Sequence, residues 1–92
     1  MEKHKTVVRV GGREYTLVSS DPPEYVHRVA AYVDRTQEEI AMATRLPSNM
    51  VAVLTSLNMA DELMKSRDEN SRLRRELMAI RQELQESRKG QA

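Results

Sequence analysis

An uninterrupted helical pattern in the C-terminal half limits the fold of this chain more than any other feature. Residues 49–89 contain neither Gly nor Pro, and a helix of that length spans about 60 Å. The second half of this segment follows a heptad with a mostly apolar seam. Its a positions are Leu63, Asn70, Leu77 and Leu84, and its d positions are Ser66, Leu73, Ile80 and Ser87. The rest of the chain is too small to cover such a seam, so the sequence predicts an oligomer joined by a coiled coil.

The charges beside the seam predict the direction in which the helices pair. Position g holds Glu62, Glu69, Glu76 and Glu83, and position e holds Arg67, Arg74, Arg81 and Arg88. In a parallel dimer each g residue faces the e residue five positions further along the partner, so every Glu meets an Arg. An antiparallel pair would bring Glu to Glu and Arg to Arg. Asn70 at an a position also fits a dimer, because two amides hydrogen-bond across the seam at some cost in stability.

The alternative is a solvated single helix with incidental ion pairs such as Asp61–Lys65 and Asp68–Arg72. Incidental charges would not place Glu at g and Arg at e four times in succession. Arg72 and Arg75, which complete a small basic cluster with Arg74, are expected to be solvated.

Residues 6–18 predict a β-hairpin. Two β-prone segments, 6–10 and 13–18, flank Gly11-Gly12, a two-residue connection suited to a primed turn with positive φ. The resulting cross-strand pairs are Val10–Arg13, Arg9–Glu14, Val8–Tyr15 and Val7–Thr16. Val8, Tyr15 and Leu17 are expected to point toward the core. A lone hairpin is not stable in water, so a helix must pack against it.

Two helices are predicted after the hairpin. Asp21 is expected to cap the first, with Pro22 at the first helical position and an end near Arg45. Ser48 is expected to cap the second. The early part of this long helix is apolar over an arc broad enough to pack against the first helix and the hairpin together. The arc contains Met50, Val53, Leu54, Leu57, Ala60, Leu63 and Met64.

The predicted fold class is α+β: a ββα head followed by a long C-terminal helix that forms a parallel dimeric coiled coil. The head and the start of the long helix are expected over residues 1–62, the coiled-coil segment over 63–89 and a frayed tail over 90–92.

Composition argues against several functions. Fifteen basic residues nearly balance fourteen acidic ones, whereas a nucleic-acid-binding protein usually carries a basic excess. There is no Cys, the N-terminus lacks the apolar stretch of a signal peptide, and no apolar run approaches the length of a membrane span. His4 and His27 are separated from each other and from any carboxylate cluster. We therefore expect a cytoplasmic, non-enzymatic protein without cofactor or metal and with no membrane or nucleic-acid partner.

The order of segments resembles one family of bacterial proteins. Residues 8–17 read Val-x-Val-Gly-Gly-Arg-x-Tyr-x-Leu, and residues 52–63 read Ala-Val-Leu-Thr-Ser-Leu-Asn-Met-Ala-Asp-Glu-Leu before the coil. This pattern, over essentially the whole chain, resembles the ZapA family of cell-division proteins. The resemblance implies a ββα head, a long helix and a parallel dimer, with an antiparallel tetramer in longer members. The short coil, with Ser at two d positions, leaves the tetramer open for this chain.

The resemblance also implies a partner and an activity. ZapA proteins bind the tubulin-like filament protein FtsZ and cross-link its protofilaments at the mid-cell division ring. Because such filaments are acidic, exposed Arg residues on the head are the candidate contacts. The candidates are Arg13, Arg28, Arg35 and Arg45. The resemblance adds weight at Arg13 and Arg45, and the alternative for each of the four is an ordinary solvated charge.

The predicted oligomerisation residues are Leu63, Asn70, Leu73, Leu77, Ile80 and Leu84 in the seam, with Glu69, Arg74, Glu76 and Arg81 beside it. Two other functions fit a coiled-coil protein. One is a DNA-binding protein of transcription-factor type, which the near-neutral charge argues against. The other is a general scaffold or adaptor whose coil recruits another helical protein.

Overall fold

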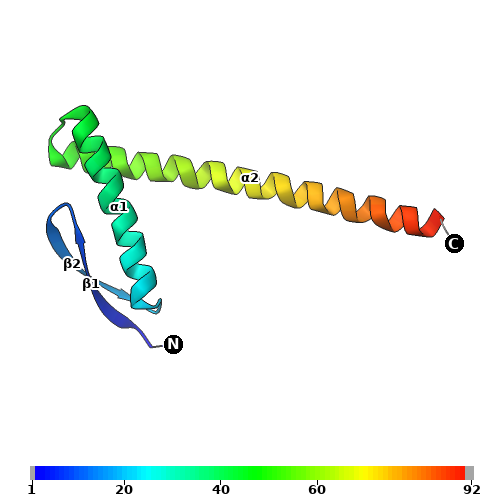
Figure 1. Ribbon diagram of the computed structural model, residues 1–92, viewed down its shortest axis with the longest axis horizontal. Helices are drawn as coiled ribbons and strands as arrows, with labels where there is room; N and C mark the ends of the chain where they lie inside the picture. The colour runs from blue at the N-terminus through cyan, green and yellow to red at the C-terminus, as the bar shows by residue number, and fades with distance from the viewer. Residues whose placement is uncertain (1, 91–92) are drawn as a thin grey trace. The chain divides into compact units, whose positions relative to one another are not determined.

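The computed structural model describes residues 2–90 as a hairpin followed by two helices (Figure 1). The strands are β1, His4–Val10, and β2, Arg13–Ser19, and the helices are α1, Pro23–Thr44, and α2, Ser48–Gly90. The predicted order of elements is confirmed, with the C-terminal helix the longest. The pairing of α2 with a second copy stays a prediction. Of the predicted frayed tail, Gly90 ends α2 and residues 91 and 92 lie outside the described part.

The hairpin has the predicted register. β1 and β2 are antiparallel, and Val10 pairs with Arg13 and Val8 with Tyr15. The register follows from the turn, because Gly11 and Gly12 have φ angles of 62° and 79°, the positive values that a primed two-residue turn requires. The Gly11 N–H also donates a 2.8 Å hydrogen bond to Oδ1 of Asp34. This bond ties the turn of the hairpin to α1.

The core of the head is small and lies between β1 and α1. Val8, Val26 and Ala30 are buried together, and Val10 packs against them. Tyr15 and Leu17 were expected in this core, but they are 49% and 43% exposed. They share the sheet face of Val8, but α1 packs against β1 and not against β2, so Tyr15 and Leu17 on β2 stay partly exposed.

Helix α1 begins one residue later than predicted. Asp21 does not cap it: the Ser19 hydroxyl donates to Oδ2 of Asp21, and the Asp21 N–H donates to that hydroxyl oxygen, both at 3.0 Å. Pro22 occupies the cap position instead, and its carbonyl accepts the Val26 N–H at 3.2 Å. The Asp21 carboxylate, which the sequence pattern predicted to cap the helix, therefore accepts a hydrogen bond within a local turn instead.

The connection between α1 and α2 contains one residue with a left-handed backbone and a proline that leads into the next helix. Arg45 follows α1 in the left-handed conformation, with φ 56°, and its N–H donates to the Ala41 carbonyl at 2.9 Å. The Pro47 carbonyl accepts the Val51 N–H at 3.0 Å. Pro47 therefore precedes the first turn of α2, and Ser48 is its first residue rather than its cap.

The chain divides into two compact units, residues 1–57 and 58–92. Within the first unit, Val51 and Thr55 are the buried residues of α2. The predicted packing arc is therefore wrong for this single chain, because Met50, Val53, Leu54 and Leu57 are all exposed. The predicted boundary at 62/63 concerns the start of the coiled coil in a dimer and stays a prediction.

Candidate interaction surfaces

All four candidate arginines of the head are exposed. Arg28 and Arg35 lie seven residues apart on α1 and therefore share one side of the helix. The Arg28 guanidinium carbon lies 5.4 Å from the centre of the Tyr25 ring, and that of Arg35 lies 5.7 Å from the centre of the Tyr32 ring. Stacking on an aromatic ring restricts a guanidinium without removing its charge. The two side chains are thus held in place on the surface.

Tyr25 and Tyr32 were not among the predicted contact residues. The signal that could have identified them is a repeat: Tyr-x-x-Arg occurs at 25–28 and again at 32–35. Residues three apart on a helix are neighbours, so each ring lies beside its Arg. Two such pairs spaced by seven residues make a stripe of aromatic and cationic groups, the residue types enriched at binding hot spots.

Arg13 and Arg45 lie elsewhere on the head. Arg13 is the first residue of β2 and borders an open groove between the hairpin and α1. Arg45 follows the last residue of α1, 17 residues beyond Arg28, which is about 25 Å along a helix. The structure therefore groups Arg28 with Arg35 and separates Arg45 from Arg28. Arg45 is also the one non-glycine residue of the described 2–90 with a positive φ.

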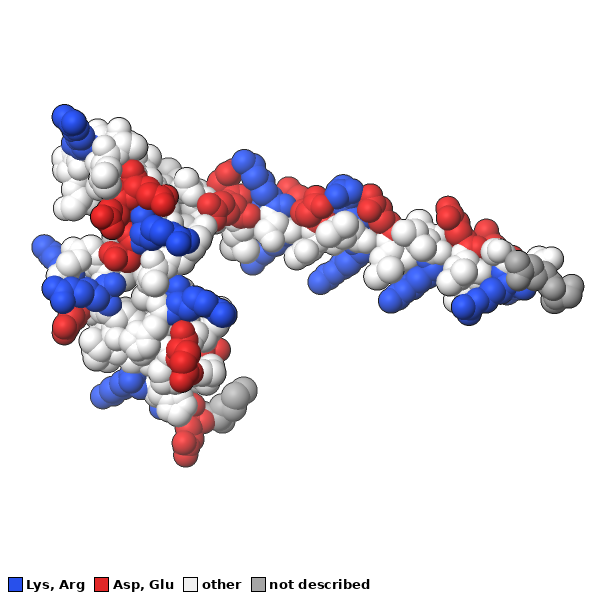
Figure 2. Space-filling model, in the orientation of Figure 1, with Lys and Arg blue, Asp and Glu red and all other residues white. Residues whose placement is uncertain are grey.

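The predicted seam of α2 is exposed along the single chain. Its apolar residues Leu63, Leu73, Leu77, Ile80 and Leu84 are all open to solvent, and Ile80 is 60% exposed. Figure 2 shows a row of basic side chains along one edge of this part of α2 and mostly acidic side chains along the opposite edge, with uncharged surface between them. An exposed apolar stripe with sorted charged flanks is the arrangement a partner helix needs.

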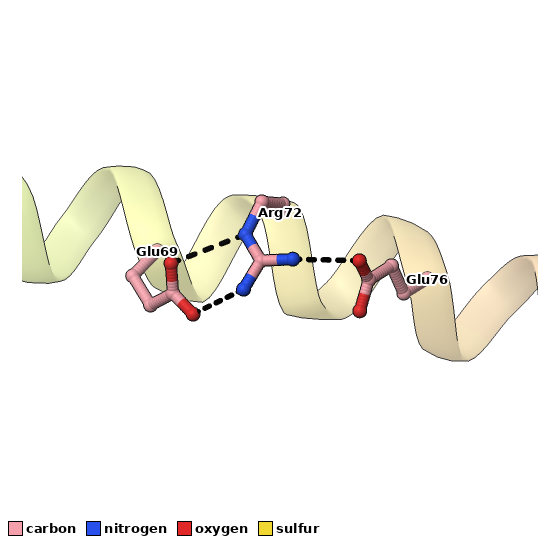
Figure 3. Close-up of polar contacts among 3 residues, drawn as sticks. All are labelled: Glu69, Arg72 and Glu76. Atoms are coloured by element: carbon pink, nitrogen blue, oxygen red, sulfur yellow. Dashed lines mark hydrogen bonds and ion pairs between the residues drawn. The ribbon is translucent and has the colours of Figure 1, made fainter.

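One charged cluster on α2 differs from the prediction. Arg72 is not merely solvated: its Nε donates to Oε2 of Glu69 at 3.1 Å, and its Nη1 donates to Oε1 of Glu76 at 2.6 Å (Figure 3). Of the two incidental pairs named for the single-helix alternative, Asp61–Lys65 is present at 2.9 Å, whereas Arg72 pairs with these two glutamates and not with Asp68. The hydrogen bond from Arg72 lowers the pKa of Glu69.

The Arg72 cluster involves residues predicted to face a partner. Glu69 and Glu76 occupy g positions, and Arg72 lies at c, away from the seam. Glu76 uses only one carboxylate oxygen for Arg72, which leaves the other free to accept a bond from a second chain. Glu76 therefore keeps one oxygen for the predicted contact with Arg81, whereas Arg72 occupies both carboxylate oxygens of Glu69, the predicted partner of Arg74.

Residues 2–90 contain no cluster of three or more metal-ligating side chains. Within the same residues, neither helix is long and apolar enough to cross a membrane.

A small ββα head that leads into a long helix with an exposed heptad seam defines a class of proteins that work through assembly with other chains. Comparison with known proteins gives the family. The model of the family "Cell division protein ZapA" matches residues 6–89. The chain belongs to this family, which is one of cell-division proteins and not an enzyme family.

Individual relatives and a solved structure agree with this result. A cell division protein ZapA from Shouchella clausii (strain KSM-K16) is 42% identical over 64 residues, which cover 68% of this chain and 82% of the relative. A cell division protein ZapA from Geobacillus kaustophilus (strain HTA426) is 37% identical over 76 residues, covering 82% of this chain and 84% of the relative. The structure described as a ZapA mutant dimer from Geobacillus stearothermophilus matches with a TM-score of 0.71 and 35% identity, covering 84% of this chain and 91% of that one.

Proposed function

We propose that the protein is a homodimeric cross-linker of FtsZ filaments that acts in the cytoplasm at the mid-cell division site. Each head binds one filament subunit, and a parallel coiled coil over 63–89 joins the two heads. Membership in a cell-division family supports the biological role. The observation that carries the linking mechanism is the exposed apolar seam from Leu63 to Leu84 with its charge-sorted flanks.

The head supplies the filament contact in this proposal. Arg13, Arg28, Arg35 and Arg45 are exposed cations, and the first compact unit carries them all. A few charge contacts with an acidic filament give an association that weakens as salt rises. The weak single contact is useful here, because bridging then depends on both heads of the dimer being engaged.

The direct test is assembly of purified FtsZ with GTP, followed by light scattering and co-sedimentation with and without this protein. We expect the protein to enter the pellet and to raise the scattering signal through filament bundling. Arg45→Glu should weaken pelleting while the protein remains a dimer. Arg75→Glu is the matched control, because it makes the same charge change on the coil, at position f. If Arg45→Glu and Arg75→Glu pellet alike, Arg45 is not part of the contact, and if the unaltered protein does not pellet, the proposed function is wrong.

A further inference from the structure

The turn of the hairpin is held against α1 by the carboxylate of Asp34. Oδ1 of Asp34 accepts the Gly11 N–H at 2.8 Å, across 23 positions of sequence. The turn also lies close to the helix one helical turn further along, because a Cβ atom added at Gly11 would stand 3.2 Å from Oε1 of Gln37. A hydrogen bond to an ionised acceptor is stronger than one between neutral groups. The bond from Gly11 is therefore a specific tie between two elements that are distant in the sequence.

Arg13 depends on this tie for its position relative to α1. It directly follows Gly11 and Gly12 as the first residue of β2, and it pairs with Val10. Helix α1 packs against β1 and not against β2, so Arg13 is connected to the helix through β1 and the turn. A two-stranded hairpin is only marginally stable without support from a helix. The end of the hairpin that carries Arg13 is supported by the bond to Asp34.

The solvent side of the turn is open to a partner. Gly11 approaches Gln37, whereas within residues 2–90 no atom beyond the chain neighbours lies within 4 Å of a Cβ added at Gly12. Arg13, the next residue, is exposed. A partner that meets several cations at once needs them at fixed separations, because ordering a mobile group on binding costs free energy. A tie that fixes Arg13 relative to α1 before binding therefore favours the complex.

We propose that Asp34 is a positioning residue for filament binding: its carboxylate fixes the hairpin turn against α1 and thereby presents Arg13 in register with the arginines of the helix. Asp34 acts through Arg13 and makes no contact with the filament itself. This role rests on the proposed function, because Arg13 is one of its filament contacts. Electrostatics alone predicts the opposite sign. Removing a carboxylate from a surface that binds an acidic filament should strengthen binding, whereas removing a positioning group should weaken it.

Amide hydrogen exchange, followed by NMR on the full-length protein, tests the tie in the absence of FtsZ. The Gly11 N–H should exchange about tenfold faster in Asp34→Ala than in the unaltered protein, because its acceptor is lost. Asp34→Asn keeps an oxygen that accepts the bond and should restore most of the protection. Glu38→Ala is the matched control, since it removes an exposed carboxylate four residues further along the same side of α1. Equal exchange of the Gly11 N–H in Asp34→Ala and the unaltered protein would overturn the proposal.

A double-mutant cycle in the FtsZ co-sedimentation assay tests the route through Arg13. Asp34→Ala should weaken pelleting roughly threefold or more while the protein remains a dimer, and Asp34→Asn should restore most of it. Arg13→Gln should weaken pelleting of the unaltered protein but change little in the Asp34→Ala background, because the contact at Arg13 is already impaired. Arg28→Gln, on α1, should have the same fold effect in both backgrounds. A general loss of head structure would instead remove the effects of both arginine exchanges.

The outcomes distinguish a wrong positioning role from a wrong function. If the unaltered protein does not pellet with FtsZ, the proposed function is wrong, and the positioning role falls with it even where the Gly11 N–H is protected. If the unaltered protein pellets and Asp34→Ala pellets equally or more strongly, the filament contact stands and the positioning role is wrong. Arg13→Gln that pellets like the unaltered protein, or that has its full effect in the Asp34→Ala background, would also show that Asp34 does not act through Arg13.

Discussion

Arg45 combines an unfavourable backbone conformation with an exposed charge. The residue after a helix is commonly Gly when it adopts the left-handed conformation, because a side chain raises the energy of that region. Here the position holds Arg, with φ 56°, and for such a residue the conformation costs about 1–2 kcal/mol. Strained residues cluster at functional sites. The conformation of Arg45 therefore supports its place among the proposed filament contacts.

The strain at Arg45 gives a prediction in which stability and binding change in opposite directions. Arg45→Gly should raise the free energy of unfolding by about 1 kcal/mol, because Gly adopts a positive φ without the steric cost, and it should weaken pelleting with FtsZ because the charge is lost. Urea denaturation and co-sedimentation measure the two effects. Arg75→Gly, the same exchange in a helix interior, should instead lower stability by about 1 kcal/mol. A destabilised Arg45→Gly protein would contradict the account of strain, and full pelleting would remove Arg45 from the contact.

At the scale of the element, local rules predicted the hairpin. Gly11-Gly12 specifies a turn with two positive φ angles, and once the turn is known the pairing of β1 with β2 follows without further information. The same rules placed the start of α1 one residue early. Asp21 is a good capping residue, but Ser19 competes for its carboxylate, and a sequence pattern does not reveal which local hydrogen bond is formed.

The side of α2 that faces the head could not be predicted from the sequence. Residues 50–57 are uncharged on every side, so the amphipathic pattern that orients most helices is missing. The pattern favoured the larger side chains, Leu54 and Leu57, whereas Val51 and Thr55 are the ones buried.

The ion pairs of Arg72 could not be predicted from the sequence either, because this residue has acidic neighbours at several spacings. Its choice of Glu69 and Glu76 depends on side-chain conformation, which the sequence does not determine.

The coiled-coil assignment of the α2 seam predicts that a charge placed in the seam prevents association. Ile80→Glu would place a carboxylate at a d position on both chains, and two unpaired charges in an apolar seam strongly disfavour association. We expect the variant to sediment as a monomer at micromolar concentration. Met78→Glu is the control: Met78 is also exposed and apolar, but it lies at b and should leave the dimer intact. A dimeric Ile80→Glu protein would show that the coil assignment is wrong.

At the scale of the whole molecule, cross-linking requires that two heads act together. A head that binds a filament weakly dissociates quickly, but while one head of a dimer stays bound, the other is held near the filaments at a high effective concentration, about millimolar for short linkers. Bridging therefore gains strength without any new contact. In the proposed function the two heads and the coil have separable roles: the heads would determine whether a filament is bound, and the coil would determine whether two filaments are joined.

This separation predicts different defects for head and coil variants in the same FtsZ assay. Ile80→Glu leaves every residue of the head unchanged, so the monomer should still bind filaments at high protein concentration, yet it should raise light scattering no more than FtsZ alone, because one head cannot bridge. Arg45→Glu should remain a dimer but show both weaker pelleting and a smaller rise in scattering. Met78→Glu should behave like the unaltered protein in both measurements. Bundling by a variant shown to be monomeric would mean that a single chain carries two filament-binding surfaces, and the dimer would then not be the bridging unit.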